Sequence, residues 1–178
     1  KGVDPLRMAA VSKATAPKTS FFRKFSMASG SQWSIVAWPN EVWAKKVFPD
    51  KNTEDAMEAL MDAILYASRV TDTNDPVEEW IDHTKRLEKH SNMLNKLHFK
   101  TLKFKNSAGT DLSIDLVENH IWAGGAEVSL NGFEFAPNIP TEEVFSMPQA
   151  HGVNGRVVAT LPLSYSGKLI ENFYLDFD

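Results

Sequence analysis

The stretch LKFKNSAGTDLSIDL, residues 102–116, shows most clearly which kind of fold the chain adopts. Residues 102–105 alternate Leu and Phe with lysines, and residues 112–116 alternate Leu and Ile with Ser and Asp. A period of two is typical of strands with one apolar face. Residues 106–109 interrupt the alternation with Asn and Gly, so the pattern predicts a β-hairpin with a longer loop.

Before this hairpin, apolar residues recur at helical spacing. Four helix starts are predicted by a capping residue in front of such a pattern: Asp4, Asn40, Asn52 and Asp75. The first helix is expected to stop before Pro17, the second at Pro49, and the fourth near Leu97. The compact apolar run at residues 33–38 predicts one buried strand.

After the hairpin, turn signals separate further strands. Strands are expected at residues 126–130, 155–161 and 168–177, and turns at the Gly-Gly or Asn-Gly pairs that begin at Gly124, Asn131 and Asn154. The expected fold class is therefore α/β plus β. Residues 1–100 would be the helix-rich C-terminal part of an α/β domain, and residues 101–178 an antiparallel, β-rich unit that begins the next domain.

Composition excludes several classes of protein. The 178 residues are 43% hydrophobic and include five Trp and eleven Phe, enough for a core. The formal net charge of -4 argues against a nucleic-acid binder. The absence of cysteine excludes disulfides and thiolate zinc sites, and it fits a reducing cytoplasm. No apolar run approaches the roughly 20 residues that span a bilayer, so a membrane protein is not expected.

The two ends of the sequence favour a piece cut from a longer protein. The first residue is Lys1 and not Met, and residues 173–178 alternate like a strand with no turn after them. We therefore expect an internal fragment.

Common catalytic motifs are missing. The chain has no GxGxxG, no GxSxG and no HExxH. Of its five histidines, His83 and His90 share one predicted helix but lie seven positions apart, about 10 Å, which is too far to share one zinc ion. Each is expected at the surface or as a hydrogen-bonded core residue. His120 and His151 fall in loop-like sequence, where a place at the edge of a site stays open.

The most informative stretch for chemistry is PNIPTEEVF, residues 137–145. Two prolines stiffen it, and the adjacent carboxylates of Glu142 and Glu143 follow. Successive side chains of an extended segment point to opposite faces, so only one of the two can face a cation. A carboxylate is a plausible ligand for a divalent metal. From spacing alone, however, an ordinary exposed pair is the favoured interpretation.

The whole chain resembles the family of aminopeptidase T, aminopeptidase S and PepS. The motifs that carry the resemblance occur in the family's order: WAKKVFPD (43–50), NKLHF (95–99), GTDLSIDL (109–116), WAGG (122–125), FEFAPNIPTEEVF (133–145) and NGRVVATLPL (154–163). The resemblance implies a cytoplasmic exopeptidase that removes N-terminal residues from peptides, and a homodimer.

The resemblance also implies two divalent metal ions, of zinc, cobalt or manganese, held by two Glu, two His and one Asp with a nearby Tyr. The first Glu lies in the TEEVF motif and corresponds to Glu143, with Glu142 as the second choice. The other ligands would lie beyond Asp178, and the family also extends before Lys1.

One carboxylate cannot hold two cations. The isolated chain is therefore expected to bind no active-site metal and to be inactive. The alternative function is a non-catalytic peptide-binding or dimerisation module with no metal role.

Overall fold

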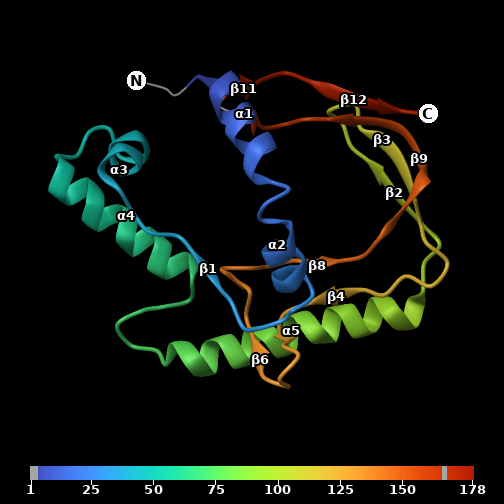
Figure 1. Ribbon diagram of the computed structural model, residues 1–178, viewed down its shortest axis with the longest axis horizontal. Coiled ribbons are helices and arrows are strands. Elements are labelled where there is room, and N and C mark those ends of the chain that lie inside the picture. Colours follow the sequence, from blue (N-terminus) through green and yellow to red (C-terminus); the bar gives the residue numbers. More distant parts are fainter. Residues whose placement is uncertain (1–3, 166–167) are drawn as a thin grey trace. The chain divides into compact units, whose positions relative to one another are not determined.

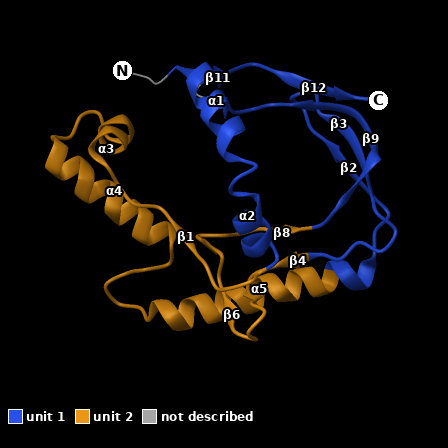
Figure 2. Ribbon diagram, viewed as in Figure 1, with its two compact units in different colours: residues 1–28, 94–122, 146–178 blue, residues 29–93, 123–145 orange. Residues whose placement is uncertain are grey.

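The computed structural model describes residues 4–165 and 168–178, which form helices and mainly antiparallel strands (Figure 1). The chain divides into two compact units (Figure 2). Unit 1 comprises Lys1–Ala28, Leu94–Trp122 and Ser146–Asp178, and unit 2 comprises Ser29–Met93 and Ala123–Phe145. These interleaved units do not follow one boundary near residue 100. The assignment of residues 1–100 and 101–178 to two domains of a longer protein stays a prediction.

The helix starts were predicted correctly. Helices α1 (Pro5–Thr15), α3 (Glu41–Val47), α4 (Thr53–Ala67) and α5 (Pro76–Leu97) each follow one of the four capping residues. The side chain of Asn40 accepts the backbone N–H of Trp43 at 3.1 Å, and that of Asp75 accepts the N–H of Val77 at 2.8 Å. These bonds satisfy amide groups that a helix start leaves without an intrahelical partner. Helix α2 (Ser20–Met27) was not predicted, and its N-cap Thr19 makes no side-chain capping bond.

The main buried cluster of unit 2 lies where α3 meets α4. Ala44 and Ala56 are fully buried, and Leu60 is 3% exposed. Phe48, Met57 and Ile64 pack against these three residues. The two alanines carry no bulk beyond Cβ, so the helices can approach closely and enclose the leucine.

The strands of unit 2 are short and come in pairs. Strand β1 (Ile35–Val36) pairs in parallel with β7 (Asn138–Ile139). Strand β4 (Ala123–Gly124) pairs with β8 (Val144–Phe145), and β5 (Glu127–Val128) with β6 (Glu134–Phe135), both antiparallel. A turn joins β5 to β6, as Asn131-Gly132 predicted, with the N–H of Gly132 donating to the carbonyl of Ser129 at 2.8 Å.

The strand predicted at residues 33–38 is present but short, and its predicted burial was wrong. Strand β1 contains two residues, Ile35 and Val36, which are 62% and 59% exposed. Apolar composition indicated burial, but β1 pairs with β7 over only two positions, and its side chains stay open to solvent.

Unit 1 contains a four-stranded antiparallel sheet. Its strands run in the order β12 (Tyr174–Phe177), β9 (Pro148–Val158), β3 (Asp111–Leu116), β2 (Thr101–Lys105). The predicted hairpin is confirmed, because β2 and β3 pair from Thr101↔Asp115 to Lys105↔Asp111. The strand expected at 168–177 is in fact two strands, β11 (Lys168–Ile170), which pairs with β10 (Leu163–Tyr165), and β12.

The turn predicted at Asn154-Gly155 is wrong, because both residues lie inside β9. Gly155 has a φ of +107° and pairs with Leu112 and Phe177. A Cβ at this position would collide with the carbonyl oxygen of Asp111. The glycine therefore allows two strands to approach closely and does not reverse the chain.

Candidate metal-ligand segment

The two carboxylates singled out in the sequence lie in the link between β7 and β8 of unit 2. Glu142 and Glu143 are both exposed. Their surroundings nevertheless differ, and the difference separates their chemical roles.

Glu142 is engaged by two basic side chains. Its Oε1 accepts a hydrogen bond from Nη2 of Arg69, and its Oε2 lies 3.7 Å from Nε2 of His83. The carboxylate side chain is 66% exposed, so its ion pair with Arg69 stabilises the fold by about 1 kcal/mol at most. The pair still compensates the charge of Glu142.

His83, on α5, is buried with 3% of its surface exposed. Its Nε2 lies 2.7 Å from the carbonyl oxygen of Thr141, which can only accept, so Nε2 is the donor. The ring of Trp80 packs edge-on at 5.5 Å between ring centres. The expectation of a hydrogen-bonded core histidine is confirmed for His83, and this nitrogen offers no lone pair to a metal.

Glu143 is free of such partners. Among residues 4–165 and 168–178, no hydrogen bond or ion pair engages its carboxylate. Its backbone is closely packed, since a Cβ on Gly124 would lie 2.7 Å from the carbonyl oxygen of Glu143 and 2.8 Å from Cγ1 of Val144. A fixed backbone therefore carries an uncommitted carboxylate.

This arrangement fits one ligand of a metal site and not a complete site. A carboxylate oxygen is a suitable donor for zinc, manganese and other divalent cations. Within the described residues, no group of three or more His, Asp or Glu side chains could hold a metal ion. Glu143 is thus a candidate donor of one oxygen ligand and, in the part of the chain that the structure describes, not part of a complete metal site.

Two hollows of unit 2 border the contacts of this segment. One, of about 640 Å³, is lined by Tyr66, Arg69, Asn74, Glu79, Pro140 and Glu142. The other, of about 500 Å³, is mostly apolar and is lined by residues that include Val77, Trp80, Ile81, Phe135 and Ile139. Arg69 and His83 were not predicted as partners of Glu142 or Thr141, because 73 and 58 positions of sequence separate the paired residues.

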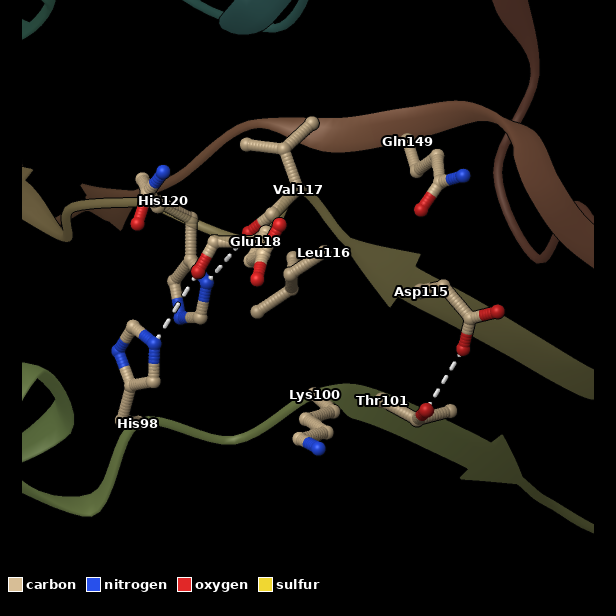
Figure 3. Close-up of a pocket in the computed structure, with 10 residues that line it drawn as sticks. His98, Lys100, Thr101, Asp115, Leu116, Val117, Glu118, His120 and Gln149 are labelled. Atoms are coloured by element: carbon tan, nitrogen blue, oxygen red, sulfur yellow. Dashed lines mark hydrogen bonds between the residues drawn. The ribbon is translucent and has the colours of Figure 1, made fainter.

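Unit 1 has a separate polar hollow, also of about 640 Å³ (Figure 3). The rings of His98 and His120 stack in it with centres 4.5 Å apart. Nε2 of His98 donates to the carbonyl of Glu118 at 3.2 Å, and Nδ1 of His120 to that of Val117 at 2.9 Å. His120 thus lines this hollow, whereas His151 lies exposed on β9.

None of the helices in the described part of the chain combines the length and hydropathy needed to cross a bilayer.

Comparison of the whole chain with known proteins defines its class. The model of the thermophilic metalloprotease (M29) family matches residues 1–178, and the chain belongs to this family. The solved structure of wild-type AmpT from Thermus thermophilus superposes with a TM-score of 0.85 at 33% identity, covering 100% of this chain and 43% of that chain. The mixed helical and antiparallel-sheet fold is therefore shared.

Individual relatives are aminopeptidases by name. The chain is 42% identical to aminopeptidase AmpS of Bacillus subtilis over 100% of its own length, and 41% identical to aminopeptidase 2 of Geobacillus stearothermophilus over 99%. It is 38% identical to aminopeptidase T of Thermus aquaticus over 100% of its length. The chain spans 42–43% of the length of these relatives. The resemblance stated from the sequence motifs is confirmed.

Proposed function

We propose that this chain is part of a metal-dependent aminopeptidase, a hydrolase that removes N-terminal residues from peptides. Membership of a metalloprotease family and relatives named as aminopeptidases support the proposal. The observation that carries it is the exposed Glu143 carboxylate, which the described residues leave without a partner on a closely packed backbone.

In the complete enzyme, Glu143 would supply one oxygen ligand to a pair of divalent ions of zinc, cobalt or manganese. Such ions activate water and polarise the scissile carbonyl when bound. The role of this chain is to keep a carboxylate exposed and anchored by its backbone where the remaining ligands can meet it. Glu142 is the weaker candidate, because Arg69 already compensates its charge.

The test is Glu143→Gln in the complete enzyme, which keeps the shape of the side chain and removes its charge. Loss of a partner that only orients a metal ligand lowers activity about 10- to 100-fold, so loss of a ligand should lower peptide hydrolysis at least about 100-fold. Bound metal, measured by mass spectrometry after dialysis, should fall as well. Glu88→Gln, an exposed glutamate of α5, is the matched control. Full metal content and full activity in Glu143→Gln would favour the non-catalytic module instead.

We also infer that the 178-residue chain is inactive by itself, that the complete enzyme is a homodimer, and that it acts in the cytoplasm. One carboxylate cannot hold two cations, and the described residues add no further ligand group. Release of amino acid from a leucyl chromogenic substrate by the purified 178-residue chain would contradict the first inference. Sedimentation of the complete enzyme as a monomer would contradict the second.

A further inference from the structure

We propose that Arg69 and His83 are positioning residues that fix the Thr141–Glu142 step to unit 2 and so leave Glu143 as the one free carboxylate of the pair. The inference rests on the proposed function, because it explains how this chain presents the ligand assigned there. It concerns residues outside the TEEVF motif, one just after α4 and one in the first half of α5.

The backbone of Arg69 is the first observation. Arg69 follows the last turn of α4 with a φ of +63°, in the left-handed region where glycine is favoured. Its N–H donates to the carbonyl of Tyr66 at 3.0 Å, and its carbonyl accepts from Nδ2 of Asn74 at 2.8 Å. An arginine held in a conformation that suits glycine indicates that its side chain has a use that outweighs the strain.

That use is visible at the other end of the side chain. Nη2 of Arg69 donates to Oε1 of Glu142, and the arginine side chain is only 26% exposed. A guanidinium beside a carboxylate compensates its charge and repels an approaching cation. Arg69 thus removes Glu142 from competition for a metal, whereas its guanidinium makes no ion pair with Glu143 among the described residues.

His83 supplies the second point of attachment. Its buried Nε2 donates to the carbonyl of Thr141 at 2.7 Å, one residue before Glu142. Trp80 packs on the His83 ring and donates through Nε1 to the carbonyl of Ser68 at 2.8 Å, one residue before Arg69. The contacts therefore close a ring, from Arg69 to Glu142, through Thr141 to His83, and through Trp80 back to Ser68.

A closed ring of this kind has a chemical consequence. With the Thr141 carbonyl and the Glu142 carboxylate both held, the backbone that leads into Glu143 has little freedom to rotate. Glu142 and Glu143 share this stretch of backbone, so holding Glu142 against Arg69 also limits the orientations open to Glu143. Positional fixing of a ligand before the metal arrives raises the affinity for the metal.

The first experiment replaces Arg69 with glycine in the complete enzyme and measures Zn²⁺ affinity by competition with a chelator. Glycine suits the backbone at this position, so Arg69→Gly should keep or raise the melting temperature. Zn²⁺ affinity should nevertheless fall about tenfold, as for other residues that orient a ligand, and excess Zn²⁺ should restore kcat. Arg69→Lys keeps the positive charge and should recover part of the affinity. Arg86→Ala, at an exposed position of α5, is the control.

The second experiment tests the hydrogen bond of His83. His83→Gln keeps a donor that can reach the Thr141 carbonyl, whereas His83→Phe keeps a ring without a donor. Zn²⁺ affinity should fall about tenfold in His83→Phe and stay within a few-fold of wild type in His83→Gln. His90→Phe, on an exposed face of the same helix, is the control for the substitution itself.

Glu143→Gln, run beside these variants, separates the two proposals. Zn²⁺ binding as tight as wild type in Glu143→Gln would overturn the proposed function. Loss of Zn²⁺ in Glu143→Gln together with wild-type affinity in folded Arg69→Gly and His83→Phe would overturn the positioning role alone. Should His83→Phe fail to fold, Arg69→Gly decides, because its substitution relieves backbone strain.

Discussion

The sheet of unit 1 and the glutamate segment of unit 2, residues 123–145, hold their chains in different ways. In the sheet, β3 pairs with β2 on one edge and with β9 on the other, so backbone hydrogen bonds fix it along its length. In the segment, each strand contains two residues, and side chains such as Arg69 and His83 provide the other attachments. A segment fixed by few side chains can be rearranged by few substitutions, whereas a sheet averages each change over many bonds.

The largest expected effect tests whether unit 2 depends more on side-chain packing than unit 1. Leu60→Ala should lower the free energy of unfolding of unit 2 by about 2–5 kcal/mol, because it opens a cavity in the α3–α4 cluster. Leu112→Ala, in the sheet, should lower the free energy of unfolding of unit 1 by less. Leu112 is 8% exposed, and the backbone pairing on both sides of it remains. Hydrogen exchange of the 178-residue chain measures the free energy of unfolding of each unit separately. Equal losses of unfolding free energy in Leu60→Ala and Leu112→Ala would contradict this difference between the two units.

At Gly155 of the sheet, a side chain should matter as much as in the segment. Gly155→Ala should destabilise unit 1 by more than about 1 kcal/mol, because it adds a Cβ against the Asp111 carbonyl at a positive φ. Gly132→Ala is the matched control, with a φ of +81° and nothing within 4 Å of the added Cβ. Both glycines have a positive φ, so both variants carry the backbone strain. The difference between their free energies of unfolding, measured in urea, therefore gives the effect of the close approach alone. A difference of zero would contradict the assignment of Gly155 as a close-approach residue.

Gly124 offers the corresponding test in the segment. Gly124→Ala places a Cβ 2.7 Å from the carbonyl oxygen of Glu143, so it should shift the backbone of the proposed ligand. We expect Zn²⁺ affinity of the complete enzyme to fall about tenfold, the range seen when support of a ligand is lost. Gly155→Ala, assayed while folded, should leave Zn²⁺ affinity unchanged. An equal loss of Zn²⁺ affinity in Gly124→Ala and Gly155→Ala would contradict the view that only the segment supports the proposed ligand.

The smallest expected effect is a pH dependence within the sheet. Nε and Nη2 of Arg156 donate to the carboxylate of Asp176 at 2.6 and 2.8 Å, and this hydrogen bonding lowers the pKa of Asp176 below its ordinary value. A group with a lowered pKa stabilises the fold at pH values above its ordinary pKa. This contribution is lost as the pH falls through the lowered pKa. Wild type should therefore lose slightly more stability than Asp176→Asn between about pH 5 and pH 2. Parallel pH profiles of the two proteins would contradict it.

The same contrast explains how much of the molecule could be predicted from the sequence. The helix starts at Asn40, Asn52 and Asp75 and the β2–β3 hairpin depend on neighbouring residues, so their patterns were sufficient. Strand β9 was predicted to begin only at residue 155, because Asn154-Gly155 is a local turn signal that pairing with β3 overrides. Pairing between distant segments leaves no such local pattern.

For the candidate site, the sequence supplied the carboxylates and not their surroundings. Glu142 and Glu143 were singled out by their place after two prolines and by resemblance. Which of them is already paired depends on Arg69, 73 positions away, and no spacing rule connects the two. The left-handed backbone of Arg69 was equally hidden, because glycine is the usual signal for that conformation and is absent there.

The strand order of unit 1 has a consequence for how the protein is made. Strands β2 and β3 leave the ribosome first, and β9, which covers the second edge of β3, is completed only after residue 158 has been added. Until then, β3 presents an unpaired edge to other nascent chains. The two acidic residues of β3, Asp111 and Asp115, discourage this edge from pairing with a second copy. Slowing synthesis between the two strands should therefore increase aggregation more than slowing it elsewhere.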